Sequence, residues 1–159
     1  MIVYLSVIGF FTIAFADQKG RAFHVGEVVQ GDIYGINVIK AEVQNEFKDM
    51  HGRISPSQSN HKLLVLEVRF YENGSPLKDK AKEEGEILKL SIIDATGRIF
   101  PAPLTESNKV IFRYILYGKD PKEAYEKEGF IYQVFFSVPK NSSGFKLQYR
   151  NLPQVSLGL

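Results

Sequence analysis

The stretch KLLVLEVRFY, residues 62–71, decides the fold class of this chain. Its apolar side chains recur at every second position, which places on one face Leu64, Leu66, Val68 and Phe70. Glu67 and Arg69 fall on the opposite face. A strand that is buried on one side requires this period of two. The following residues 72–76, ENGSP, have the chemistry of a turn and end the strand.

Outward from this stretch, the same alternation recurs in short segments separated by turn residues. These segments are residues 87–93, 110–117, 130–138 and 145–149. Pro139 ends the third of them because it lacks a backbone donor, and Gly97 can supply a positive φ in the tight turn at 94–97. Residues 33–47 change phase after Val38, which predicts a β-bulge or a strand that switches sheets.

The pattern predicts an all-β fold: an antiparallel β-sandwich of about seven strands with one short helical turn. The helical turn is expected at residues 120–127, where Asp120 can cap the helix and Pro121 suits its first position. Long loops are expected at 48–61, 73–86, 101–109 and 117–129. Binding residues collect on loops that a rigid sandwich holds, so these loops are the expected place for a site.

Composition narrows the function classes. The chain has 159 residues and no cysteine, which suits one domain without disulfides or a thiol nucleophile. Twenty Lys and Arg residues oppose 18 Asp and Glu residues, and the charges alternate in runs such as KDKAKEEGE (78–86). A nucleic-acid binder concentrates positive charge on one face. We therefore expect a mixed, solvated surface and no nucleic-acid partner.

The first 16 residues, MIVYLSVIGFFTIAFA, contain no charged side chain and end in the small-x-small pattern Ala14-Phe15-Ala16. This is typical of a secretory signal peptide, although no Lys or Arg precedes the apolar run. We expect cleavage before Asp17, one domain over residues 17–159, no membrane span after cleavage, and a location in the periplasm or outside the cell. The alternatives are an uncleaved anchor, for which about 20 apolar residues are needed, and a buried strand of a cytoplasmic fold.

Three stretches in this order resemble a known family: NHKLLVLEVRFYENGS (60–75), LKLSIIDATGRIF (88–100), and GFIYQVFFSVPK (129–140) with FKLQY (145–149). Together with the segment HVGEV (24–28), they resemble the bacterial secreted immunoglobulin-like domains of unknown function related to the immunoprotective extracellular antigen. The resemblance covers about residues 23–150. It implies an immunoglobulin-like sandwich outside the cytoplasm and transfers no catalytic residues.

A metal site is one hypothesis for the loop between the first strands. Met50, His51 and His61 could supply thioether and imidazole ligands, which suit copper, or zinc through the histidines. The alternative is that these are solvent-exposed loop side chains, since no ligand pair has the His-x-x-x-His spacing. We expect no bound cofactor.

The sequence does not favour an enzyme. No Gly-x-Ser-x-Gly elbow is present for a hydrolase, and the chain has no phosphate-binding glycine motif. Carboxylates for glycoside hydrolysis lie in lysine-rich segments where we expect too little burial to shift a pKa. They are Glu83, Glu84, Glu86, Glu123, Glu126 and Glu128. We therefore predict no catalytic residues.

Aromatic side chains indicate a binding function instead. Tyrosines gather at 114–132, and tyrosine presents an apolar face with a polar tip that suits protein interfaces. The alternative is that they pack the sandwich. The candidate binding residues are Arg113, Tyr114, Tyr117 and Tyr125. The sequence thus predicts a non-catalytic module that binds an envelope or extracellular protein through a sheet edge or the long loops, with a periplasmic small-ligand or metal-binding protein as the alternative.

Overall fold

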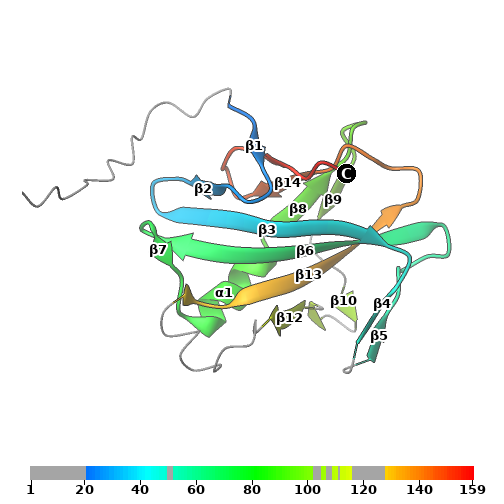
Figure 1. The fold of residues 1–159 in the computed structure, drawn as a ribbon, viewed down its shortest axis with the longest axis horizontal. Helices are drawn as coiled ribbons and strands as arrows, with labels where there is room; N and C mark the ends of the chain where they lie inside the picture. The colour runs from blue at the N-terminus through cyan, green and yellow to red at the C-terminus, as the bar shows by residue number, and fades with distance from the viewer. Residues whose placement is uncertain (1–20, 50–51, 102–104, 107–108, 111, 116–127) are drawn as a thin grey trace, which may run out of the picture.

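The computed structural model describes residues 21–49, 52–101, 105–106, 109–110, 112–115 and 128–159, which form an all-β sandwich (Figure 1). The larger sheet has the spatial order β12 (Phe112–Ile115), β13 (Ile131–Pro139), β6 (His61–Glu72), β3 (Tyr34–Gln44) and β2 (Val28–Gln30), with β7 (Ser75–Pro76) paired to β6. The smaller sheet has the order β1 (Phe23–His24), β15 (Val155–Ser156), β14 (Lys146–Tyr149), β8 (Leu90–Ile93) and β9 (Ile99–Pro101). All these pairs are antiparallel except β1 with β15.

Three further elements lie beside the two sheets. They are the hairpins β4 (Phe47–Asp49) with β5 (Gly52–Ile54) and β10 (Thr105–Glu106) with β11 (Lys109–Val110), and helix α1 (Lys80–Ile87). The predicted helical turn at 120–127 lies outside the described residues. Within the described part of the chain, no helix is long and apolar enough to cross a membrane.

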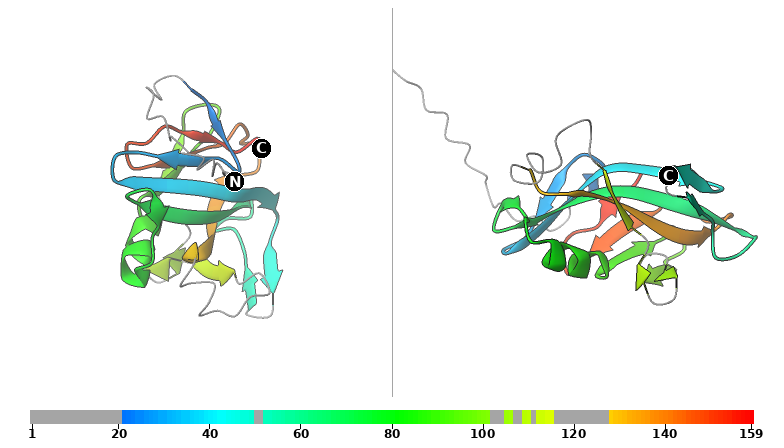
Figure 2. Two further views of the ribbon diagram at one scale, coloured as in Figure 1. Left: turned by 60° about the vertical axis from the view of Figure 1, so that its left-hand side comes forward. Right: turned by 90° about the horizontal axis from the view of Figure 1, so that it is seen from below.

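The core lies between the two sheets, which Figure 2 shows from two further directions. The larger sheet contributes alternate residues of β6 and β13, including Phe70 and Tyr132, as the period of two predicts. The smaller sheet contributes Leu147 and Tyr149 from β14, and the rings of Phe70 and Tyr149 lie 5.4 Å apart between centroids. The predicted sandwich is therefore confirmed.

Strand β6 is buried on both faces along part of its length, which the sequence analysis did not predict. Leu63 and Val65 point away from the main core and pack with Phe135 and Ile54 in a second cluster. The β4–β5 hairpin, which lies in a segment predicted as a loop, contributes Ile54 and Phe47 to this cluster. The Phe47 ring meets the Phe135 ring edge-on at 5.1 Å.

Replacing Phe47 by alanine is expected to lower the free energy of unfolding by about 1–2 kcal/mol, because a half-buried ring loses its apolar and aromatic contacts. Urea unfolding would measure the change. Ile99→Ala is the control: Ile99 is 62% exposed on β9, and its truncation should change stability by less than about 0.5 kcal/mol. Equal effects of the two changes would contradict a packed second cluster.

The predicted phase change in residues 33–47 is a β-bulge. Val38 pairs with Val68, but Lys40 pairs with Glu67, so Ile39 is the extra residue. Because of this extra residue, the side chains after the bulge face the same side of the sheet as Val38 does at every second position. Ala41 therefore lies opposite Leu66 and packs against the main core.

Helix α1 corrects the prediction of a loop at 73–86 and a strand that begins at residue 87. Asp79 caps the helix, and its Oδ1 accepts from the backbone amides of Ala81 and Lys82 at 3.1 and 3.2 Å. The buried face carries two carboxylates, Glu83 and Glu86, besides Ile87. An apolar stripe at helical spacing was therefore missing from the sequence, and no amphipathic signal could be read.

The turn between β8 and β9 has the predicted positive φ at Gly97, 82°. Asp94 is buried there and accepts hydrogen bonds from the amide and hydroxyl of Thr96 and from the amide and Nε of Arg98. Burial alone would raise the pKa of Asp94, but these hydrogen bonds hold it well below its ordinary range. Asp94 therefore anchors this turn as a carboxylate.

Candidate functional site

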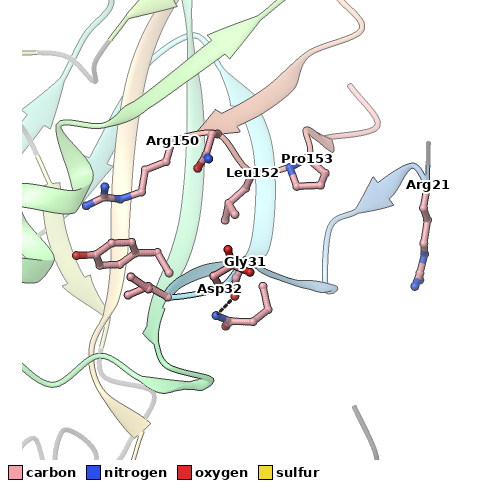
Figure 3. A pocket seen from close by; sticks show the side chains of 10 residues that line it. Arg21, Gly31, Asp32, Arg150, Leu152 and Pro153 are labelled. Atoms are coloured by element: carbon pink, nitrogen blue, oxygen red, sulfur yellow. Dashed lines mark hydrogen bonds between the residues drawn. The ribbon is translucent and has the colours of Figure 1, made fainter. Parts of the chain in front are cut away.

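A groove of about 700 Å³ opens at one end of the sandwich. It lies between the β2–β3 turn and the turn that follows β14, and Arg21 lines its far end (Figure 3). The two turns come from opposite ends of the chain. The lining includes Arg21, Asp32, Ile33, Tyr34, Arg150 and Leu152.

Glycine at position 31 lets the two turns approach. A Cβ atom on Gly31 would lie 2.5 Å from Cδ2 of Leu152, so no larger residue fits without displacing that side chain. The Gly31 amide donates to the Tyr34 carbonyl at 2.8 Å and closes the first turn. The Leu152 amide donates to the Tyr149 carbonyl at 3.1 Å and closes the second. The groove is therefore bounded by two hydrogen-bonded turns.

Arg150 lies at the inner end of the groove in a fixed orientation. Its Nε donates to Oε2 of Glu86 at 2.8 Å, and its Nη2 donates to Oε1 at 2.6 Å. Its guanidinium also lies over the Tyr34 ring, 3.8 Å from the centroid. The bidentate pair and the stacking hold the planar cation at the boundary between helix α1 and the groove.

The carboxylate of Glu86 receives two further hydrogen bonds. The Tyr149 hydroxyl donates to Oε2 at 2.6 Å and Lys89 Nζ donates to Oε1 at 2.7 Å. Burial alone would raise the pKa of Glu86, but the donors Arg150, Lys89 and Tyr149 outweigh it and lower the pKa to about 2. The pKa of the Tyr149 hydroxyl is raised by burial and by this carboxylate. Glu86 is therefore charged throughout the physiological range.

Glu83, one turn earlier on α1, is buried and has no cationic partner among the described residues. The Tyr132 hydroxyl donates to its Oε2 at 3.1 Å, and Oε1 has no hydrogen-bond partner among the described residues. Burial raises the pKa of Glu83 to about 7, and hydrogen bonds from Tyr132 and the Phe130 amide offset it only in part. The expectation that the carboxylates of this lysine-rich segment are too exposed for shifted pKa values is wrong for Glu83 and Glu86.

The predicted tyrosine site is only partly described. Arg113 and Tyr114 lie on β12, where the register pairs them with Gln133 and Tyr132 of β13. Tyr117 and Tyr125 lie outside the described residues. The proposal that these four residues form a binding site therefore stays a prediction.

Of the three predicted metal ligands, His61 alone lies in the described part of the chain. Met50 and His51 lie outside the described residues. His61 begins β6 opposite Pro139, and its Nδ1 is enclosed with no partner in the described part of the chain. No group of three or more possible ligands occurs among the described His, Asp and Glu residues. Metal binding through Met50, His51 and His61 stays a prediction.

The sequence analysis missed the groove and the Arg150–Glu86 pair. The two residues are 64 positions apart, and Glu86 stands in a run of mixed charge that reads as a solvated face. The only local signal was Asn151 and Pro153, which are typical turn residues after the last predicted strand.

The fold and the groove define a class: an all-β sandwich with an open groove at one end, next to a buried ion pair. In the comparisons with known proteins, no protein-family model, no curated protein and no solved structure matches the chain.

Proposed function

We propose that this protein is an exported, non-catalytic, immunoglobulin-like module that binds another protein of the cell envelope or the extracellular space. One observation carries the proposal: the open groove, with fixed walls and mixed polar and apolar lining, at one end of a rigid sandwich. Binding sites are typically concave and largely preformed, with a few polar groups that give orientation.

The surface near the groove supports a protein as the partner. Ile33, in the groove, is 51% exposed, and Val28 on the neighbouring strand β2 is 44% exposed. Within the described residues, β2 is paired on one side only. An unpaired strand edge next to exposed apolar side chains suits an extended segment of another chain. The apolar N-terminal stretch at 1–16 supports the export part of the proposal.

A photo-crosslinking side chain at Ile33 is expected to capture one envelope or extracellular protein reproducibly, because the partner would lie over the groove. The protein would be expressed in its host with its own N-terminus, and captured species would be identified by mass spectrometry. The same probe at Ile99, which is 62% exposed on β9 in the other sheet, is the matched control. It is expected to give no such product.

The mass of the captured chain tests export in the same experiment. A chain that begins at Asp17 and crosslinks through Ile33 supports the proposal. A chain that retains Met1 and crosslinks to cytosolic proteins contradicts it, and so do equal products from Ile33 and Ile99.

A further inference from the structure

We infer that the groove receives an extended peptide segment of the partner that carries a single carboxylate, and that the Arg150 guanidinium binds this carboxylate. The inference rests on the proposed binding function and specifies its ligand. It follows from the unused donors of Arg150, the charge around it, and the groove lining.

Arg150 has hydrogen-bond donors left over from its pair with Glu86. A guanidinium has five N–H donors, and the pair with Glu86 uses Nε and one hydrogen of Nη2. No described residue accepts from Nη1, and the side chain remains 25% exposed at the groove. The remaining donors already have a fixed orientation, so a ligand oxygen would meet them at little further entropic cost.

The charge around Arg150 also favours an anion. Glu86 contributes one negative charge, while Arg150 and Lys89 contribute two positive charges, so this cluster carries a net charge of +1. Within the groove lining itself, Arg21 and Arg150 are the cations and Asp32 is the carboxylate, so the lining also carries one excess positive charge. A carboxylate at this place would complete the charge balance through charge-assisted hydrogen bonds.

The backbone conformation of residue 150 indicates that an arginine side chain is required at this position. Arg150 has φ of +50°, one of two positive φ values at non-glycine residues in the described chain. A left-handed conformation costs a non-glycine residue about 1–2 kcal/mol, and glycine would avoid this cost. The pair with Glu86 requires a guanidinium at this position, which glycine could not supply.

The rest of the lining limits the ligand to one carboxylate. Asp32 is exposed in the groove, and Glu27 pairs with Arg21 at the far end, so a polyanion would meet like charge. Ile33, Leu152 and Pro153 provide apolar lining in the same groove. The fitting ligand is therefore an acidic side chain or a chain-terminal carboxylate flanked by apolar residues.

The test is an NMR titration of the full chain with defined peptides. The acidic probe is acetyl-Ser-Val-Glu-Val-Ser-amide, and its neutral match has Gln in place of Glu. A third peptide, the neutral sequence with a free C-terminal carboxylate, distinguishes the two sources of the carboxylate. We expect the Glu peptide to shift the amide resonances of Gly31 and Ile33 and the Nε–H resonance of Arg150, and to bind about 10-fold more tightly than the Gln peptide.

Two variants separate recognition from folding. Arg150→Lys keeps the charge but loses the planar fork, and is expected to reduce the preference for Glu over Gln to less than about 3-fold. Arg53→Gln, on β5 outside the groove with its side chain 60% exposed, is expected to keep the full preference. Should Arg150→Lys not fold, the shift of the wild-type Arg150 Nε–H resonance by the Glu peptide and not by the Gln peptide decides the matter.

Three results would overturn the inference: equal affinity for the Glu and Gln peptides, shifts confined to residues outside the groove, or no shift at about millimolar peptide, the weak end of measurable affinity. Failure of the inference is distinct from failure of the proposed function. Capture of a partner through Ile33 without a carboxylate preference would retain the binding module and reject the ligand.

Discussion

Replacement of Arg150 by alanine is expected to lower the free energy of unfolding by about 3 kcal/mol at pH 7, because it leaves Glu86 buried with part of its charge uncompensated. Glu86 would retain only Lys89, whose side chain is 44% exposed, and the Tyr149 hydroxyl. The variant also loses the stacking of the guanidinium on Tyr34. Chemical unfolding of both proteins measures the difference.

Two matched variants identify the cause of this loss. Arg150→Gly should be about 1 kcal/mol less destabilising than Arg150→Ala, because glycine adopts the positive φ without strain. The double variant Glu86→Gln with Arg150→Ala should recover part of the loss, because no buried charge remains. A double variant no more stable than Arg150→Ala would show that the charge on Glu86 is not the cause.

The pH dependence of this pair has a definite sign. The folded pKa of Glu86 is lowered to about 2 from 4.5, so its stabilising contribution is present above pH 4.5 and is lost as the pH falls toward 2. In Arg150→Ala, the guanidinium no longer lowers the pKa of Glu86. The stability difference between wild type and variant should therefore shrink as the pH is lowered from 5 toward 2.

Replacement of Glu83 by glutamine is expected to raise the free energy of unfolding by about 2–3 kcal/mol at pH 8, because it removes a buried charge that no described cation compensates. The amide has nearly the shape of the carboxyl group, and its oxygen can accept from the Tyr132 hydroxyl as Glu83 Oε2 does. Chemical unfolding at several pH values measures the effect.

The contribution of Glu83 to stability changes with pH in the direction opposite to that of Glu86. The folded pKa of Glu83 is raised to about 7 from 4.5, so the folded state binds more protons than the unfolded state between these values. Wild-type stability from this group therefore falls as the pH rises from 4.5 to 7 and is constant above. In Glu83→Gln this fall should be absent, and near pH 4 the two proteins should differ little.

Glu84→Gln is the control, since its side chain on the same helix is 40% exposed and its substitution should change stability by less than about 0.5 kcal/mol. A constant difference between Glu83→Gln and wild type from pH 4 to pH 8 would contradict the raised pKa of Glu83.

The sandwich could be predicted because its signals are local. Alternation along residues 62–71 and 130–138 reports which side chains face the core, and Pro139 and Gly97 mark a strand end and a turn. The phase change after Val38 likewise indicated a bulge or a strand that switches sheets, and the structure has the bulge. These patterns arise within a few residues of one chain segment, so no knowledge of distant partners was needed.

Helix α1 was not predicted from the sequence, for a definite physical reason. Its buried face depends on carboxylates, and a carboxylate is a core residue only where the fold supplies donors to it. Tyr132, Tyr149 and Arg150 supply these donors from strands β13 and β14 and the following turn. The sequence at 80–87 reads as a solvated segment because these donors lie about 50–60 positions away in the chain.

By itself, the sequence determined the all-β class and the inward faces of the strands at 62–71 and 130–138, because strand periodicity is a property of neighbouring residues. Only the tertiary structure decided that Glu83 is buried with a raised pKa, that Glu86 is paired with Arg150, and that Gly31 contacts Leu152 to bound a groove. Each of these depends on which distant segments the sheets bring together, and the cost of burying a charge depends on those neighbours rather than on the residue that carries it.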